Sequence, residues 1–141
     1  MNTRFVLTGL RLVMGFIFLW AFVDKVFGLG FATKPENSWL HGGSPTTGFL
    51  SFATKGPFSA LFKGLAGVPF IDWLFMLGLL CIGLTLILNR FVVWGAAAGV
   101  VMLLLMWLAV LPPANNPIID EHIVYILVLA LLAIESKAGA L

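Results

Sequence analysis

The sequence predicts an all-α membrane protein in which four apolar helices form an up-down-up-down bundle. Hydrophobic residues make up 61% of the chain and charged residues 10%, and the mean hydropathy is +1.09, which excludes an ordinary soluble domain. Four apolar stretches approach the roughly 20 residues that a helix needs to cross a bilayer. They are continuous rather than alternating, which favours helices over barrel strands. We predict one domain, 1–141, with spans at 5–27, 70–88, 91–111 and 117–135.

The first span follows an arginine and resembles a signal peptide at its start. However, the apolar run is rich in aromatic residues and no small-x-small cleavage site follows it, so we interpret it as a retained helix. Arg11 shares a helix face with Gly15, Phe18, Phe22 and Lys25. Because Arg11 lies two turns inside the apolar run, we expect it either to snorkel to the surface or to contact an acidic or anionic partner in the bundle.

The connection at 28–69 is too long for a simple turn and predicts short helices. Ser44-Pro45 supplies an N-cap with proline in the first helical position, and Gly56 can end that helix. Pro57 can begin a second helix whose apolar stripe has helical spacing. This segment is either an amphipathic helix in the membrane interface or over the bundle, or an ordinary covered loop. The stripe consists of Phe58, Leu61, Phe62 and Leu65.

The second and third spans are joined only by Asn89-Arg90 and must form an antiparallel hairpin. Gly95 and Gly99 form a small-xxx-small pattern, which lets helix backbones approach closely. This pattern can mark a homo-oligomer contact, but contact within the bundle is favoured. The single cysteine, Cys81, cannot form an internal disulfide, and we interpret it as a small packing residue.

For the fourth span, Asn116-Pro117 predicts the N-cap and first helical position, which places Asp120 and Glu121 near the first turn. The basic residues favour an orientation with both termini in the cytoplasm and the long connection outside the cell membrane. Arg4, Arg90 and Lys137 lie on the terminal side, whereas the connection at 112–117 has no basic residue.

Ionisable residues gather at one end of the predicted bundle, which we call the polar face. The helix dipole accounts for most of them, since acids are favoured at helix starts and bases at helix ends. Asp24 does not fit, because a carboxylate at a helix C-terminus is disfavoured. We therefore expect Asp24 to have a partner, either Lys63 or His122. The polar face consists of Asp24, Lys25, Asp72, Asp120, Glu121 and His122.

His122 and Tyr125 are spaced i, i+3 on one face of the fourth helix. Such a pair beside carboxylates can donate to a quinone carbonyl or pass protons. The alternative is a histidine satisfied by a neighbouring acid. Several tryptophans near this end are either interfacial anchors or walls of a pocket for a flat ring. These are Trp20, Trp39, Trp73 and Trp107.

Several other chemistries are not expected from the sequence. A haem held by two imidazoles would need His41 and His122 together, and the chain has no Cys-x-x-Cys-His motif. It has no glycine-rich nucleotide loop and no zinc-ligand spacing, so we expect no haem, metal or nucleotide. A net charge of +2 is too small to indicate nucleic acid.

The sequence resembles the DoxX/DoxD family of membrane proteins. The resemblance rests on Arg11–Gly15 running into Asp24-Lys25, on Asp72 followed by Gly78 and Gly83, on 42–45, and on 111–113 through 120–122. It implies a four-helix membrane bundle and a link to thiosulfate:quinone oxidoreductase, whose large subunit is DoxD-like. Other members are similar to partners of soluble redox enzymes. The family pattern usually has a lysine at the position of Lys25 and an acidic residue at the position of Asp72, so the resemblance implies these two as site residues.

The first functional hypothesis is therefore a membrane subunit of a quinone-linked oxidoreductase. Quinone would enter from the bilayer, and thiosulfate would need cations such as Lys25, Lys55 and Lys63. The alternatives are a non-enzymatic scaffold that docks a soluble redox protein, and a small-molecule or lipid carrier. The candidate catalytic residues are Asp24, Lys25, Asp72, His122 and Tyr125, and the candidate substrate-binding residues are Arg11, His41, Trp73, Trp107 and Glu121.

Overall fold

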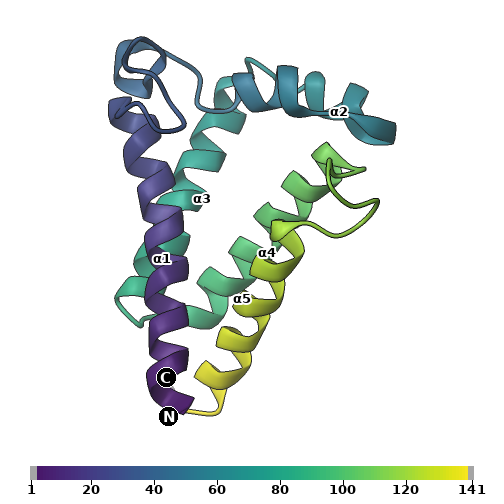
Figure 1. The fold of residues 1–141 in the computed structure, drawn as a ribbon. Helices are drawn as coiled ribbons and strands as arrows, with labels where there is room; N and C mark the ends of the chain where they lie inside the picture. The colour runs from purple at the N-terminus through teal and green to yellow at the C-terminus, as the bar shows by residue number, and fades with distance from the viewer. Residues whose placement is uncertain (1–2, 140–141) are drawn as a thin grey trace.

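A computed structural model describes residues 3–139, and within them every regular element is helical. The long helices are α1 (Thr3–Phe27), α3 (Pro69–Ile87), α4 (Val92–Val110) and α5 (Glu121–Lys137) (Figure 1). Three of them, α1, α3 and α4, are long and apolar enough to cross a membrane. Large apolar side chains are exposed around these helices, among them Phe5, Phe16 and Trp94. These features indicate a membrane protein.

The helix α5 begins later than the sequence predicts. Asp120, not Asn116, is its N-cap, and the Asp120 carboxylate accepts from the His122 backbone N–H at 3.0 Å. The Asn116 side chain instead accepts from the N–H groups of Ile118 and Ile119, both at 2.9 Å, and closes a turn before the helix. With 17 residues, α5 is about 25 Å long, which is less than the ~30 Å of a hydrocarbon core.

The long helices pack as two pairs. Helix α1 lies along α3, α4 lies along α5, and contacts between α3 and α4 join the pairs. The pairs meet near the chain termini and diverge toward the long connection (Figure 1). The shared core contains Met76, Ile82, Leu86 and Leu129, all fully buried. The helix ends that form the polar face therefore point toward the connection, as predicted, although α5 begins well below the ends of α1 and α3.

Gly95 and Gly99 are both buried within the chain. A Cβ at Gly95 would overlap the Thr85 side chain on α3, and one at Gly99 would lie 2.7 Å from a methyl group of Leu129 on α5. The pattern therefore serves contact within the chain, which is the use favoured from the sequence. Cys81 is exposed on α3, so the interpretation as a buried packing residue was wrong.

Arg11 points inward, and its guanidinium lies against the last turn of α3. Its Nη1 donates to the carbonyl oxygens of Leu86 and of Ile87, the latter at 3.1 Å. The last carbonyls of a helix have no partner within the helix, and a cation favours this end of the dipole. Both expectations for Arg11 were therefore wrong, because it neither snorkels nor contacts an acid. It lies at the last turn of α3, at the opposite end from Asp72 of the polar face.

We expect Arg11→Met to lower the free energy of unfolding by about 1–3 kcal/mol, because the side chain is 8% exposed and donates to two carbonyls. Thermal unfolding in detergent measures this change. The matched control is Arg90→Met, at an exposed arginine near the same end, which should leave the midpoint nearly unchanged. Equal effects of the two substitutions would contradict the capping role.

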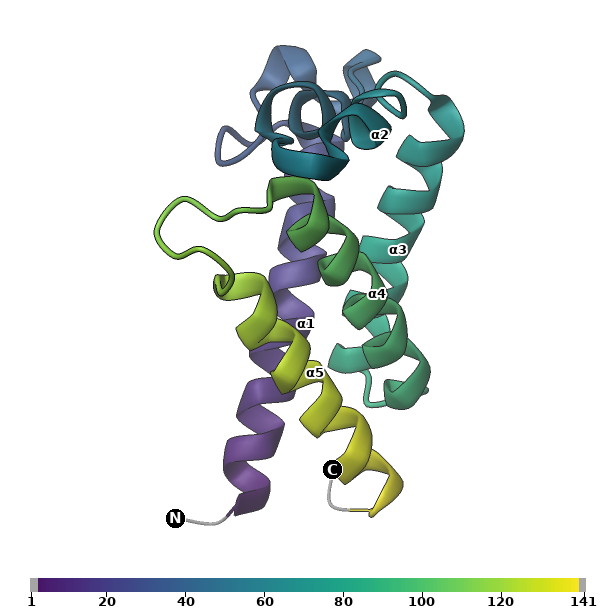
Figure 2. The same ribbon diagram turned by 90° about the vertical axis from the view of Figure 1, so that its right-hand side faces the viewer.

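The long connection folds over the diverging ends of the helices (Figure 2). The Ser44 Oγ accepts from the Thr47 backbone N–H at 3.1 Å and closes a turn, but the predicted helix start at Ser44-Pro45 was wrong, because the helical segment that follows has Gly48 as its N-cap. The Lys55 N–H donates to the Ala109 carbonyl at 3.0 Å and ties the connection to the end of α4. The helical segments are short, and the first two were not predicted: η1 (Pro35–Asn37), η2 (Trp39–His41), η3 (Phe49–Ala53), η4 (Gly56–Phe58) and α2 (Ser59–Lys63).

Candidate functional site

Asp24 holds the start of the connection against the end of α1. Its carboxylate accepts from the backbone N–H groups of Phe31 (3.3 Å), Ala32 (2.9 Å) and Thr33 (2.8 Å), and the side chain is 1% exposed. Charge-assisted bonds of this kind stabilise a carboxylate in a position that the helix dipole disfavours. The expectation of a partner was correct, but the choice of Lys63 or His122 was wrong. In this structure Asp24 is a structural anchor.

Asp72 anchors a later part of the same connection. Its Oδ1 accepts from the Ser44 hydroxyl at 2.8 Å, from the Thr46 hydroxyl at 2.5 Å and from the Thr46 N–H at 3.3 Å. Asp72 lies in the first turn of α3, so the dipole favours its charge as well. Asp24 therefore attaches the connection to the end of α1, and Asp72 attaches it to the start of α3.

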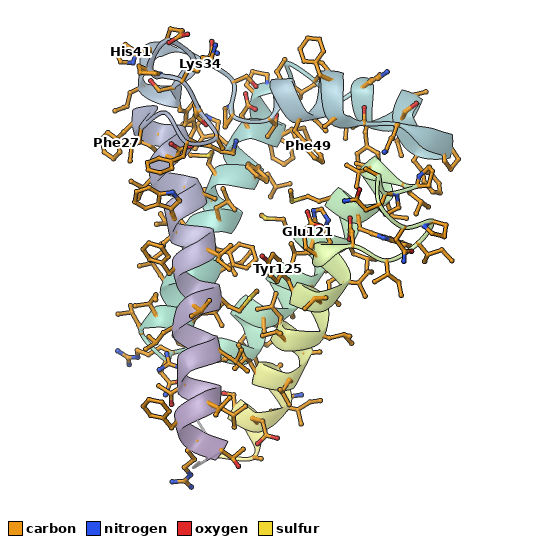
Figure 3. All side chains as sticks on the ribbon, viewed as in Figure 1. Phe27, Lys34, His41, Phe49, Glu121 and Tyr125 are labelled. Atoms are coloured by element: carbon orange, nitrogen blue, oxygen red, sulfur yellow. The ribbon has the colours of Figure 1, made fainter. Side chains whose placement is uncertain are left out.

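His122 pairs with the acid that caps its own helix. Its Nδ1 lies 2.9 Å from Asp120 Oδ2, and both side chains are largely buried. This agrees with the interpretation of a histidine satisfied by a neighbouring acid. Tyr125 packs against the core, on the side of α5 that faces α1 (Figure 3). Neither residue lies among those that line the cavities described below.

The candidate substrate-binding residues are dispersed rather than gathered. His41 lies at the far end of the connection, away from Glu121 and Tyr125 (Figure 3), and its Nδ1 is 2.6 Å from the Ser38 hydroxyl. Trp73 is 56% exposed and stacks edge-on with Trp39, with 4.7 Å between ring centroids. The Trp107 indole N–H donates to the Ile118 carbonyl at 2.7 Å. The structure therefore does not gather these residues into one pocket.

A large cavity lies instead between α3 and α4, beneath the connection. Its volume is about 650 Å³. The walls come from α3 and α4, and the roof from the connection. Phe49, from the roof, lies between the upper ends of these two helices (Figure 3). The lining includes Thr46, Phe49, Phe75, Gly78, Trp94, Ala97, Ala98 and Met102.

Lys25 is the only residue of the candidate set that lines this cavity. It comes from the last turn of α1, and its ammonium lies 5.9 Å from the centroid of the Phe75 ring. Thr46 supplies the one hydroxyl in the lining, and that hydroxyl is already donated to Asp72. The cavity therefore has an apolar body and a single charged group at its roofed end.

A second, smaller cavity of about 330 Å³ lies at the start of α5. It is lined by Lys55 from the connection and by Asp120 and Glu121 from α5. Asp120 is occupied by its capping bond and by His122. The lining of this cavity therefore carries one ammonium and two carboxylates, which is a small excess of negative charge.

The cavity lining was largely missed in the sequence because α3 and α4 are apolar on all sides. The lining positions of α4 recur at helical spacing, from Trp94 through Ala98 and Val101 to Leu105. A signal was present in the small residues Ala97 and Ala98, which lie between the two glycines that were attributed to helix packing. Residue type does not distinguish a helix face that lines an apolar cavity from a helix face that contacts lipid.

Residues 3–139 contain no group of three or more His, Cys, Asp or Glu side chains arranged to hold a metal ion. Comparisons of the chain with protein-family models, with curated proteins and with solved structures gave no match.

Proposed function

We propose that this chain is an integral membrane protein that binds an amphipathic, lipid-soluble ligand in the cavity between α3 and α4. The supporting observation is an apolar cavity of about 650 Å³ with one cation, Lys25, at its roofed end. Small-molecule sites are commonly mostly apolar clefts of about 300–1,000 Å³ with a few polar groups that orient the ligand. The apolar body would bind a chain or ring, and Lys25 would bind the head group.

A quinone belongs to this class of ligand, and the proposal includes a quinone-binding subunit of an oxidoreductase. The Lys25 ammonium can donate to a quinone carbonyl. Electrons would come from a soluble redox partner, because the single cysteine cannot supply a dithiol. The cavity is better suited to a quinone than to thiosulfate. Thiosulfate is a dianion and needs several cations to offset its desolvation, whereas the lining of this cavity offers one.

The proposal also includes the membrane arrangement. We propose that α5 spans the membrane as the fourth helix of an up-down-up-down bundle, with lipid or the preceding loop making up its short length. Arg90 and Lys137 lie at the end of the bundle where the chain begins and ends. This favours termini in the cytoplasm and a connection outside the cell membrane.

We expect Ala98→Trp to weaken ligand binding about tenfold or more, because the indole would occupy the cavity that Ala98 lines. The probe is decylubiquinone, measured by equilibrium dialysis against the protein in detergent. The matched control is Leu127→Trp, at a residue that is 65% exposed on α5 and outside the cavity.

This experiment tests the proposal in two ways. Unchanged affinity in Ala98→Trp would place the bound probe elsewhere. If the wild-type protein bound neither decylubiquinone nor a long-chain fatty acid, the proposal of an amphiphile site would be wrong.

A further inference from the structure

Lys25 lies in the last turn of α1, and its side chain lines the apolar cavity. A basic residue in the last turn of a helix is favoured by the dipole, which explains the charge at the end of α1. It does not explain why the side chain extends into an apolar cavity beneath the connection. The Phe75 ring, 5.9 Å away, gives the ammonium one partial compensation through its π face.

The nearby carboxylates make their hydrogen bonds to other groups, although Asp24 keeps its charge and attracts the Lys25 ammonium at longer range. Asp24, the preceding residue, is buried and accepts three backbone N–H groups of the connection. Asp72 accepts from Ser44 and Thr46. No carboxylate oxygen of residues 3–139 lies within 4.0 Å of the Lys25 ammonium. Lys25 therefore has no ion-pair partner in the part of the chain that the structure describes.

An ammonium in apolar surroundings that makes no direct ion pair is compensated only in part for its desolvation, here by the Phe75 ring and by the longer-range attraction of Asp24. A neutral head group, such as a quinone carbonyl or an alcohol, donates or accepts one hydrogen bond but leaves the charge unbalanced. An anionic head group supplies both the hydrogen bond and the opposite charge. The charge of the cavity therefore favours an anion over a neutral polar group.

The shape of the cavity limits what can lie beyond that anion. Pro45, Thr46 and Phe49 form a roof over the same cavity that Lys25 lines. A phospholipid carries further head-group atoms beyond its phosphate, and the roof opposes them. A carboxylate at the end of a chain needs no such space. The hydrocarbon chain of the ligand would then run between α3 and α4, where Gly78 and Ala97 contribute little or no side chain to the lining.

We infer that the ligand is a long-chain carboxylate, bound with its carboxylate on Lys25 under the connection and its chain between α3 and α4. This inference rests on the proposed amphiphile site and adds the charge and end group of the ligand. The same geometry makes Lys25 the residue that selects for the head group, whereas the apolar walls bind any chain of suitable width.

The test compares palmitate, hexadecanol and decylubiquinone as ligands of the full-length protein in nanodiscs of neutral phosphatidylcholine. Photo-reactive forms of the first two probes identify the labelled segment by mass spectrometry. We expect palmitate to bind at least about tenfold more tightly than hexadecanol, with labelling of 94–106. Lys25→Met should remove most of that preference, Lys25→Arg should retain it, and Lys34→Met, at an exposed lysine of the connection, should not change it.

Each outcome decides a separate point. Equal binding of palmitate and hexadecanol, or tighter binding of decylubiquinone, would overturn the anionic head group while sustaining the amphiphile site. No binding of any probe would overturn the proposed function itself. The comparison of palmitate with hexadecanol uses only the wild-type protein, so it decides the inference even if Lys25→Met fails to fold.

Discussion

Asp24→Ala is expected to detach the start of the connection from α1 and to lower the free energy of unfolding by about 3 kcal/mol or more. The carboxylate is 1% exposed and accepts three backbone N–H groups. Hydrogen bonds to a charged group contribute about 1.5–3 kcal/mol each, and alanine would in addition leave the N–H of the buried Thr33 without its partner. The neighbouring Lys25 cannot replace the carboxylate, since an ammonium carries only donors.

Thermal unfolding and amide hydrogen exchange of Phe31, Ala32 and Thr33 measure this effect together. The exchange of these amides should become much faster in Asp24→Ala, and Asp24→Asn should give an intermediate result because an amide keeps one acceptor oxygen. Glu36→Ala, at an exposed acid on the same connection, is the matched control. Unchanged protection at 31–33 would show that the carboxylate does not hold this segment.

The same experiment separates a structural role of Asp24 from a catalytic one. If Asp24 acts only as an anchor, any loss of ligand binding in Asp24→Asn should follow the loss of protection in the connection. The carboxylate faces the backbone rather than either cavity. A substitution that abolished activity while leaving protection intact would instead support the sequence prediction of a catalytic residue.

The apolar helices could be located from the sequence because hydrophobic length is a local property. The starts and ends of α1, α3 and α4 fall within about two residues of the predicted spans. The start of α5 could not be chosen locally, since Asn116 and Asp120 are both good caps. The choice depends on a loop in which Trp107 binds the Ile118 carbonyl across the turn, and that contact is tertiary.

The candidate site was harder to predict for a different physical reason. The helix dipole accounts for most charges of the polar face, since acids are favoured at helix starts and bases at helix ends. It does not account for Asp24, which was therefore expected to have a partner. The partners are backbone N–H groups, which carry no signature in the residue letters. Likewise, the sequence placed Lys25 at the right end of the protein, but only the divergence of the helix pairs creates the cavity that it lines.

That divergence depends on where α3 and α4 are held closest, and Gly95 lies at that point. A Cβ added to Gly95 would overlap the Thr85 hydroxyl and lie 2.8 Å from Thr85 Cβ. The Thr85 side chain lies at the end of α3 and donates to the Ile82 carbonyl at 2.9 Å. The helices would have to separate to admit even a methyl group, so this crossing sets the angle at which the cavity opens.

We therefore expect Gly95→Ala to destabilise the protein by about 1–3 kcal/mol through overpacking, although alanine is the better helix former. The matched control is Gly9→Ala on α1, where an added Cβ meets nothing within 4 Å and the higher helix propensity should stabilise by several tenths to about 1 kcal/mol. Thermal unfolding in detergent compares the two. The double variant Gly95→Ala/Thr85→Gly should recover part of the loss relative to Thr85→Gly alone, because it removes the side chain that the new methyl group meets. Effects of the same sign at Gly95 and Gly9, or no coupling between 95 and 85, would contradict a close helix crossing at this point.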